Sequence, residues 1–319
     1  MSPSIINIAQ IDSSLARLAI LAEASNQHLR SSSKSPSTLQ TPISSPNPDL
    51  PQAPAPKNLA SIPNVSILEK PWVDITSDWY RGNEVTKVFI ASHNEPPAFA
   101  EESHFHVTAL NGGVKHVVRI STTAANVHPN SKAYYPRTHR AIEKMLESEE
   151  FKDMMWTSLQ PNVFTSMVLG NALALFKEYR KTGKQVPLSL ISSKDAGVGI
   201  IDSNDVGAFA AHVLADENPE KHNGKRYVLN GPQDITGQQI VDMVEKELGV
   251  PVEDVKYQDI SFLEQLYEGQ QRTIVMSIKH AVVTAWEGKC GIDTTSKEVP
   301  GIYAPKMTPA QTFKELLEE

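Results

Sequence analysis

Residues 112–164 decide the fold of this chain, and they read GGVKHVVRISTTAANVHPNSKAYYPRTHRAIEKMLESEEFKDMMWTSLQPNVF. The apolar run Val114–Ile120, set between a glycine pair and a Ser/Thr cluster, predicts a strand buried on both faces, as in a parallel sheet. A helix is expected to begin at Pro136, because proline suits the first helical position and apolar residues then recur on one face. Trp156–Leu159 predicts a second strand. The stretch is therefore a strand–helix–strand unit with polar residues at the carboxyl ends of its strands, where open α/β sheets bind ligands.

The same stretch resembles the NmrA-like family of atypical short-chain dehydrogenase/reductases. Residues 113–121 match G-V-K-x-V-V-x-x-S, residues 139–143 match K/H-x-x-x-E, and residues 156–164 match W-T-x-L-R-P-x-x-F, in the family's order and spacing. Weaker similarity extends from about Ser61 to the C-terminus. The resemblance implies an α/β fold with a Rossmann-type doubly wound parallel sheet and a smaller C-terminal substrate lobe. It also implies NAD(P) binding, with either reductase chemistry or redox sensing without turnover.

The composition restricts the partners and the location. The chain has 319 residues, a net charge of -7 and no block of like charge, which argues against nucleic acid or an anionic membrane as the main partner. Cys290 is the only cysteine, so an intrachain disulfide is impossible and a reducing compartment is expected. No apolar run approaches the roughly 18–20 residues of a membrane span, and the N-terminus lacks the pattern of a signal peptide. We therefore expect a cytoplasmic protein.

Two regions are expected along the chain. Residues 1–165 are predicted to form the NAD(P)-binding Rossmann-type region, and residues 166–319 a mixed substrate lobe with closing helices. Residues 31–57 interrupt the first region. Fourteen of these 27 positions are Pro or Ser and none is aromatic, so the segment cannot bury enough apolar surface to order itself. It is predicted to be a disordered surface insertion.

The nucleotide fingerprint is the weakest part of the resemblance. A strand is expected at residues 4–9, and the family follows it with G-x-x-G-x-x-G, but Gln10, Ser13 and Ala16 stand at the three glycine positions. Glycines there provide the tight turn, the close approach to the pyrophosphate and the close packing of helix on strand. We expect these three residues to hold the cofactor more weakly, at the start of a helix capped by Asp12 or Ser13. The alternative is an eroded element that binds no cofactor.

Two further positions bear on the choice of cofactor. Arg30 and Lys34 follow the expected second strand, where the family often carries a basic residue for the 2′-phosphate of NADP, and the planar guanidinium suits phosphate. The alternative is a solvated arginine. No acidic residue directly follows the strand, so nothing favours the ribose contact of NAD, and the expected cofactor is NADP with NAD possible. Ser92 ends an expected buried strand at residues 85–92, whose end should face the cofactor.

The catalytic residues are expected in the central stretch. Short-chain dehydrogenases use a serine and a Tyr-x-x-x-Lys motif, in which the tyrosine hydroxyl transfers the substrate proton and the lysine holds the ribose. The resemblance places Ser121 at the serine position and His139 at the lysine position, with Tyr135 four residues earlier. A histidine side chain with its reference pKa of roughly 6.5 is mostly neutral at pH 7, so the fixed charge of a lysine is lost. Histidine can instead act as a general acid or base, or hydrogen-bond the nicotinamide ribose.

Each of these residues also has a simpler interpretation. Ser121 caps the end of a strand, and Tyr135 packs over the loop. His139 begins a helix and pairs with Glu143 one turn later. Pro136 biases the preceding residue away from helical dihedral angles, so Tyr135 and His139 need not share a helix face.

The second strand of the stretch ends in a segment that the family places against the nicotinamide. The resemblance therefore implies that Pro161, Asn162 and Val163 contact the cofactor. Gln160 replaces the arginine that the family usually carries there, so one positive charge is missing.

Two other patterns make clear structural predictions. A helix is expected around residues 98–111, and its His104 and His106 are predicted to be ordinary helix residues, because a spacing of two points them apart. Thr236 and Gln239 have the spacing of a capping box, which predicts a helix start.

Three hypotheses for the function follow. The first is an NADP-preferring oxidoreductase acting on a small carbonyl, enone or quinone-like metabolite, with Tyr135 or His139 as the proton donor. Similar proteins are common in fungal metabolism, which extends this expectation to fungal secondary metabolism. The second is a non-catalytic NAD(P)-sensing regulator that binds a protein partner or a second copy of itself, favoured by the missing glycines, His139 and residues 31–57. The third is a fold that binds no cofactor.

Overall fold

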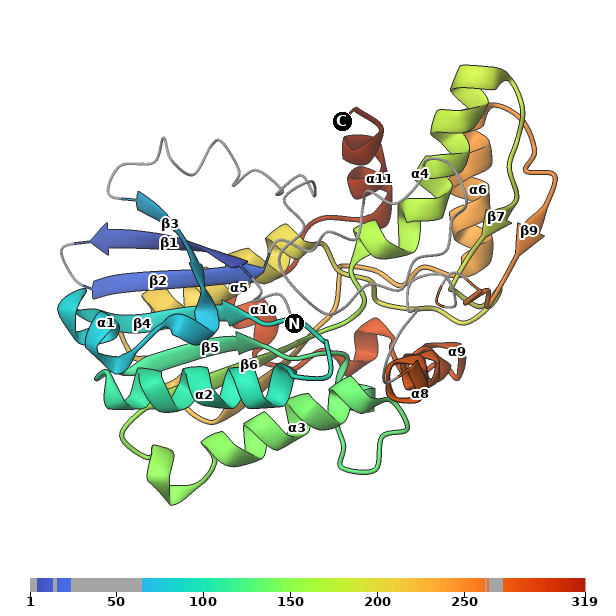
Figure 1. Cartoon of the computed structure of the whole chain (residues 1–319). Helices are drawn as coiled ribbons and strands as arrows, with labels where there is room; N and C mark the ends of the chain where they lie inside the picture. Colours follow the sequence, from blue (N-terminus) through green and yellow to red (C-terminus); the bar gives the residue numbers. More distant parts are fainter. Residues whose placement is uncertain (1–4, 14–15, 24–64, 262, 264–271, 319) are drawn as a thin grey trace, which may run out of the picture. The chain divides into compact units, whose positions relative to one another are not determined.

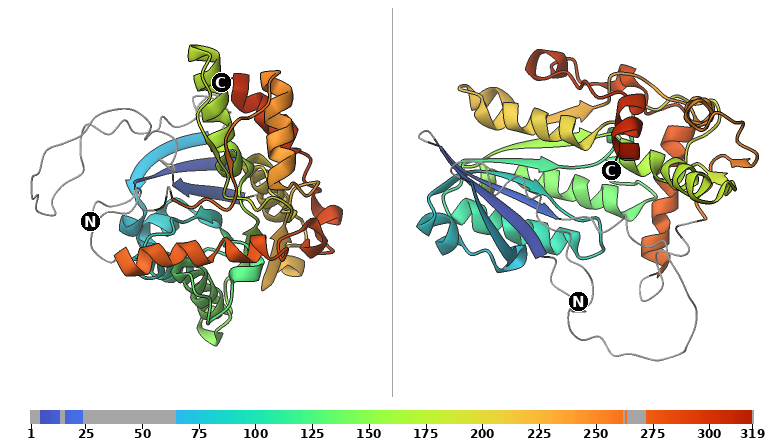
Figure 2. Two further views of the ribbon diagram at one scale, coloured as in Figure 1. Left: turned by 90° about the vertical axis from the view of Figure 1, so that its right-hand side faces the viewer. Right: turned by 90° about the horizontal axis from the view of Figure 1, so that it is seen from above.

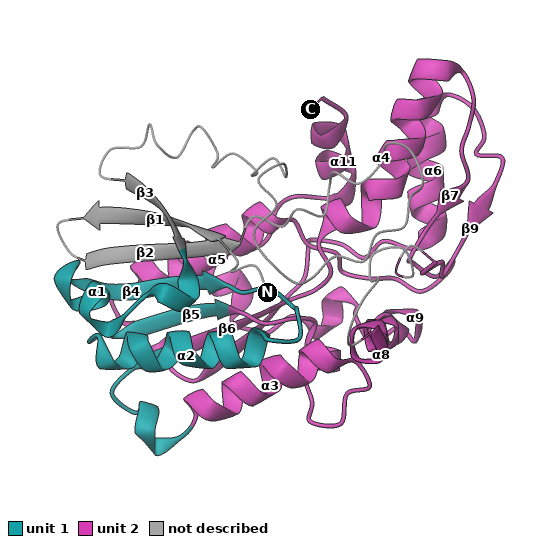
Figure 3. Cartoon of the chain, in the orientation of Figure 1, with its two compact units in different colours: residues 1–119, 148–155 teal, residues 120–147, 156–319 magenta. Residues whose placement is uncertain are grey.

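The computed structural model describes residues 5–13, 16–23, 65–261, 263 and 272–318, with backbone alone for the strands up to residue 70. The described chain has two compact units, coloured separately in Figure 3. The first comprises residues 1–119 and 148–155, and the second comprises residues 120–147 and 156–319. Arg30, Lys34 and the expected insertion at residues 31–57 lie outside the described residues.

The strands of the first unit form a mixed sheet in the order β3-β1-β2-β4-β5 (Figure 1). Strand β2 runs parallel to β4, and β4 runs parallel to β5, which confirms the predicted parallel α/β character. Strand β1 is antiparallel to both of its neighbours, β2 and β3. The bounds are β1 (Ile5–Ser13), β2 (Ala16–Glu23), β3 (Val65–Pro71), β4 (Val85–Ala91) and β5 (His116–Ile120).

The prediction of a helix after the first strand is wrong. Residues 16–23 form β2, which pairs antiparallel with β1 so that Ser13 lies opposite Ala16. Gln10 and Ser13 therefore lie within a strand, and Ala16 begins the next one. The short apolar run at residues 18–22 fits a buried strand or a helix equally well by periodicity. Pairing with β1 on one side and β4 on the other makes this segment a strand.

The first unit has two α-helices among its described residues, α1 (Ser77–Gly82) and α2 (Ala98–Asn111), and the second confirms the predicted helix. Trp72 and Tyr80 pack on Phe105 of α2, with ring centroids 6.0 and 6.1 Å away. After α2 the chain passes close to α1, since a Cβ atom on Gly112 would lie 2.5 Å from the Tyr80 Cβ. Only glycine fits this contact, and Gly113 then takes a positive φ of 88° into β5.

A buried carboxylate joins α2 to β5. Glu102 accepts hydrogen bonds from Arg119 Nε at 2.6 Å and Nη2 at 3.1 Å, and His106 Nε2 lies 3.2 Å from its Oε1. All three side chains are inaccessible to solvent. Burial alone would raise the pKa of Glu102, but the charge of Arg119 and the hydrogen bonds from His106 and Arg119 hold it well below its usual range. His106 is buried whereas His104 is exposed, so the two histidines of α2 point apart, as their spacing predicted.

In the second unit, strands β6 (Met155–Pro161) and β8 (Lys225–Leu229) pair in parallel, and a short parallel pair forms separately from β7 (Leu188–Ser189) and β9 (Val255–Lys256). The helices are α3 (Tyr134–Leu146), α4 (Thr165–Thr182), α5 (Ser203–Ala215), α6 (Gly237–Leu248), α8 (Arg272–Val275), α9 (Val283–Trp286), α10 (Val299–Ile302) and α11 (Pro309–Glu318). Short 3-10 turns across both units are η3 (Trp72–Asp74), η4 (Ala124–Asn126), η5 (Glu149–Phe151), η6 (Pro219–His222), η7 (Met276–His280) and η8 (Ile292–Thr294).

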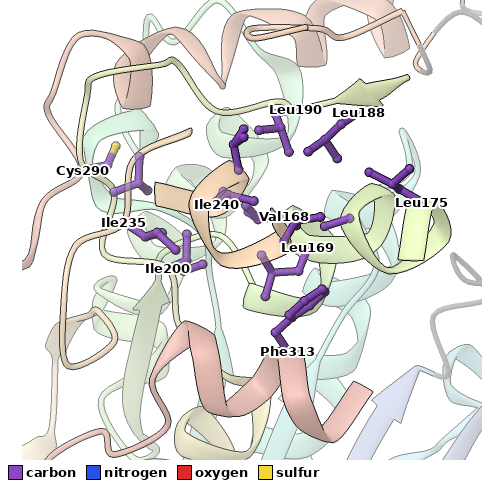
Figure 4. Packing of buried hydrophobic residues seen from close by; sticks show 14 residues of the cluster. Val168, Leu169, Leu175, Leu188, Leu190, Ile200, Ile235, Ile240, Cys290 and Phe313 are labelled. Atoms are coloured by element: carbon purple, nitrogen blue, oxygen red, sulfur yellow. The ribbon is translucent and has the colours of Figure 1, made fainter. Parts of the chain in front are cut away.

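The hydrophobic core of the second unit lies between α4, α6 and α11. Helices α4 and α6 run side by side, and α11 packs on α4 (Figures 1 and 2). Leu169, Ile240 and Phe313 are completely buried in this cluster (Figure 4). The predicted capping box at the start of α6 is confirmed, because Thr236 Oγ1 accepts from the Gln239 amide while Gln239 Oε1 accepts from the Thr236 amide.

A second buried carboxylate fixes α3 to the strands β6 and β8. Glu143 accepts hydrogen bonds from Ser158 Oγ at 2.8 Å, Gln160 Nε2 at 3.1 Å and Arg226 Nε at 2.7 Å. Its side chain is inaccessible to solvent. Arg226 also binds Glu147 at the end of the helix, so one guanidinium joins two turns of α3 to β8. The orientation of α3 therefore depends on this set of charge-assisted hydrogen bonds.

Replacing Glu143 by alanine should lower the free energy of unfolding by about 2–4 kcal/mol, because Ser158, Gln160 and Arg226 lose their buried acceptor. The matched control is Glu147→Ala, which removes the more exposed partner of the same arginine and should cost less than about 1 kcal/mol. Urea unfolding of both variants measures the difference. Equal losses in the two variants would contradict the anchoring role of Glu143.

The stability of the first unit should fall as the pH drops through about 6.5. Burial lowers the pKa of His106, and its contact with Glu102 offsets this only in part. In the unfolded chain His106 binds a proton near pH roughly 6.5, whereas in the folded chain it does so only at lower pH. Acid therefore favours unfolding. His106→Gln should flatten this slope, by up to about 1.4 kcal/mol per pH unit, whereas His104→Gln on the exposed face should not. Denaturant unfolding at pH 7.5 and pH 5.5 tests this, and an unchanged slope in His106→Gln would refute it.

Candidate functional site

The three predicted catalytic residues all lie in the second unit. Ser121 directly follows β5, and its backbone amide donates to the Leu159 carbonyl of β6 at 2.6 Å. Its hydroxyl is buried and has no hydrogen-bond partner among the residues that the structure describes. A buried hydroxyl without a partner costs about 1–3 kcal/mol, and such groups call for an explanation. Capping of the strand end uses only the backbone of Ser121, which leaves the side chain available to a ligand.

Tyr135 and His139 lie on the same face of α3. Their ring centroids are 6.3 Å apart, with the ring planes at 89°. Helix α3 begins at Tyr134, so Pro136 is its third residue rather than its first. The first turn has no internal acceptor for its N–H groups, so a proline there removes no helical hydrogen bond. The expectation that Pro136 could separate the two side chains is therefore wrong.

The histidine at the lysine position is almost enclosed. His139 is 3% exposed, whereas Tyr135 is half-buried. The edge of one ring thus meets the face of the other. Of the two rings, that of Tyr135 is the more accessible to solvent. This arrangement can present a phenol to a small molecule while the imidazole behind it is shielded from water.

The segment expected against the nicotinamide is held tightly by its own hydrogen bonds. Asn162 Nδ2 donates to Asn230 Oδ1 at 2.9 Å and to the Cys290 carbonyl at 2.8 Å, while Asn162 Oδ1 accepts from the Val163 amide at 2.8 Å. Asn162 is buried, Pro161 ends β6, and Val163 is partly exposed. The side-chain amide of Asn162 is therefore occupied by partners within the protein.

The cofactor residues predicted in the first unit are placed differently. Ser92 follows β4, and its Oγ donates to Glu102 Oε2 at 2.9 Å. Gln10 and Ser13 lie in β1 and Ala16 opens β2, so a hairpin stands where a turn and a helix N-terminus were expected. Their contact with a cofactor stays a prediction.

Several buried or paired polar residues were missed from the sequence. Arg119 lies inside an apolar strand, and a charge in such a run requires a buried partner, so its pairing with Glu102 could have been expected. Next to Ser92, His93 Nε2 lies 2.6 Å from Glu101 Oε2, so consecutive carboxylates of α2 bind consecutive residues after β4. No local sequence pattern indicates the role of Asn230, because its hydrogen-bond partners lie more than 60 positions away in the sequence.

Neither a metal site nor a membrane span is evident in the part of the chain that the structure describes. No group of three or more His, Cys, Asp or Glu side chains there could hold a metal ion. Similarly, none of the helices described is both long and apolar enough to cross a bilayer.

Comparisons with known proteins give consistent matches. (4-alkanoyl-5-oxo-2,5-dihydrofuran-3-yl)methyl phosphate reductase of Streptomyces griseus is 27% identical over 168 residues, covering 53% of this chain and 54% of the relative. NAD(P)H azoreductase of Xenophilus azovorans is 26% identical over 169 residues, covering 53% of each chain. The chain thus spans about half the length of these curated relatives.

Solved structures share the fold. An NADPH-dependent quinone oxidoreductase of Escherichia coli, in complex with NADPH, aligns with a TM-score of 0.58 and 20% identity over 77% of this chain and 82% of that chain. A model of the NmrA-like family matches residues 84–315, a region that contains Ser121, Tyr135 and His139. On this match, which covers well over half of its length, the chain belongs to the NmrA-like family.

Proposed function

We propose that this protein is an NADPH-preferring reductase of a small carbonyl, enone or quinone-like metabolite. The observation that carries the proposal is the buried Ser121 hydroxyl without a partner among the described residues, in the same unit as the Tyr135–His139 ring pair. Membership of the NmrA-like family and two relatives that are named as reductases support it. The solved quinone oxidoreductase that shares this fold is in complex with NADPH, which supports the choice of cofactor.

The chain's own residues fit one half of the cofactor better than the other. The rigid backbone of Pro161–Val163 and the Ser121 hydroxyl would face the nicotinamide end. The antiparallel pair of β1 and β2 lacks the helix N-terminus that usually receives a pyrophosphate, so this end would be held weakly. Arg30 and Lys34 remain the proposed contacts of the 2′-phosphate of NADP.

NADPH would supply the hydride. Tyr135 would donate the proton to the substrate oxygen, which leaves a phenolate. His139, packed against its ring, would return a proton to this phenolate and would itself be reprotonated from solvent. The Ser121 hydroxyl would donate a hydrogen bond to the same substrate oxygen as negative charge develops there. A positioned general acid of this kind contributes roughly 10²–10⁴-fold to the rate.

The wider setting is part of the same proposal. Residues 1–165 would form the nucleotide-binding region and residues 166–319 the substrate lobe. The protein would act in the cytoplasm, with fungal secondary metabolism as one such setting.

A second candidate function is nucleotide sensing without turnover, through a protein partner or a second copy of the chain. The observation that favours it is the β1–β2 hairpin in place of the glycine turn, because weak cofactor binding suits a sensor of cellular NAD(P) levels.

Calorimetric titration with NADPH and NADH tests cofactor binding, which both candidates require, and turnover of a neutral quinone then separates them. We expect NADPH to bind more tightly, and Tyr135→Phe to lower kcat for reduction of a neutral quinone roughly 10²–10⁴-fold with little change in cofactor affinity. Tyr179→Phe, which removes a tyrosine hydroxyl from α4, is the control and should stay within a few fold of wild type.

Each outcome has a distinct meaning. Micromolar binding without turnover of any carbonyl or quinone would favour the sensor. Undiminished turnover in both Tyr135→Phe and His139→Asn would disprove the assigned proton path. No binding of either nucleotide up to millimolar concentration would contradict both candidates.

A further inference from the structure

Residues 276–290 of the second unit, called the backing segment below, are hydrogen-bonded to the chain at three places around the candidate site. The segment comprises η7, α9 and the residues up to Cys290. The amide of Tyr134, the first residue of α3, donates to Ser277 Oγ at 3.1 Å. Asn162, in the segment expected against the nicotinamide, donates from Nδ2 to the Cys290 carbonyl at 2.8 Å.

Asn126 makes the third connection through its side chain. It ends η4, in the loop that begins at Ser121, and it is only 4% exposed. Its Nδ2 donates to the Ala281 carbonyl at 3.0 Å. The Thr284 hydroxyl lies 3.2 Å from Asn126 Oδ1 and 3.0 Å from the Ala281 carbonyl, so it can donate to either acceptor. Both polar atoms of this buried amide therefore meet partners that lie 155 and 158 positions further along the chain.

The loop that carries Ser121 is thus held at both ends by different elements. At its start, the Ser121 amide donates to the Leu159 carbonyl of β6 at 2.6 Å. At its end, Asn126 binds the backing segment. Loops are ordinarily the more mobile parts of a fold, and a loop held at one end alone can still move at the other. The direction of the Ser121 hydroxyl therefore depends on both attachments.

The backing segment connects this loop with the helix of the proposed proton donor. Ser277, Ala281 and Thr284 are four and then three positions apart, which is the spacing of neighbours on one face of a helical stretch. This face binds the loop of Ser121 through Asn126, and it binds the residue before Tyr135 through the Tyr134 amide. The two segments with proposed catalytic groups thus share one support.

We propose that Asn126 is a positioning residue for the reduction, which directs the Ser121 hydroxyl toward the substrate oxygen that Tyr135 protonates. The proposal rests on the reductase function proposed above. Asn126 touches neither substrate nor cofactor in this assignment, and it acts through the backbone of residues 121–126. A hydrogen bond to developing charge depends steeply on distance, and a misplacement of about 1 Å can lower a rate about 10²-fold.

The first test is a double-mutant cycle on the reduction of menadione, a neutral quinone, by NADPH. Asn126→Ala should lower kcat about 10–100-fold while the KM for NADPH stays within about threefold of wild type. Ser121→Ala should lower kcat by a comparable factor, since it removes the hydrogen bond itself. In the Ser121→Ala background, Asn126→Ala should lower kcat less than about threefold further, because no hydroxyl is left to position.

Thr284 tests the same connection with a smaller change to the fold. Thr284→Val removes the hydroxyl beside Asn126 Oδ1 and should lower kcat about 2–10-fold, whereas Thr284→Ser keeps the hydroxyl and should retain the kcat of wild type. The matched control is Thr312→Val in α11, which removes a buried threonine hydroxyl that donates to Asp202 Oδ2 at 3.0 Å. It should leave kcat unchanged.

Amide hydrogen exchange measures the connection without turnover. In Asn126→Ala, exchange should become faster in residues 121–127 and in residues 281–284, because each side loses its attachment to the other. Exchange in α6, which makes no hydrogen bond with Asn126, should match that of wild type.

The outcomes separate this inference from the function it rests on. Unchanged kcat in Asn126→Ala, in a protein that reduces menadione, would overturn the inference and leave the reductase standing. Equal losses of kcat from Asn126→Ala in the wild-type and Ser121→Ala backgrounds would also overturn it, since a purely structural residue behaves in this way. Faster exchange in residues 121–127 of a protein that reduces nothing would remove the reductase and the positioning role together.

Discussion

The buried carboxylate of Glu143 is the interaction on which the arrangement of the candidate site depends. A carboxylate removed from water must be compensated by charge and hydrogen bonds, and Glu143 finds both on two neighbouring strands, through Ser158 and Gln160 of β6 and Arg226 of β8. These bonds determine the rotation of α3 about its axis. That rotation in turn determines which way the face with Tyr135 points.

The first unit uses the same physical device. Glu102 of α2 is buried against Arg119 of β5, and its second oxygen also accepts from Ser92 at the end of β4. In both units a helical glutamate is thus bonded to an arginine of a strand, Glu102 to Arg119 in one and Glu143 to Arg226 in the other. Such pairs add specificity of orientation as well as stability, since an apolar contact would tolerate rotation of the helix.

The beginning of the chain departs most from what the family leads one to expect. A glycine-rich turn lets the backbone approach a pyrophosphate at a helix N-terminus, and this chain instead forms the β1–β2 hairpin with Gln10 and Ser13 inside a strand. The proposed catalytic residues, Ser121 and the Tyr135–His139 pair, lie within the region matched by the family model. Such a protein would hold the cofactor mainly at its nicotinamide end and less at its pyrophosphate.

The sequence by itself determined the family, the parallel α/β character and most elements whose signal is local. The capping box at Thr236 and the buried strand Val114–Ile120 belong to this group, because capping and burial patterns depend on residues a few positions apart. Tertiary structure alone decided the rest. Residues 16–23 became a strand because they pair with β1 and β4, and Glu143 acquired partners 15 to 83 positions away. The Tyr134 amide likewise donates to the Ser277 hydroxyl, 143 positions further along the chain, and no local pattern carries information about contacts over such a separation.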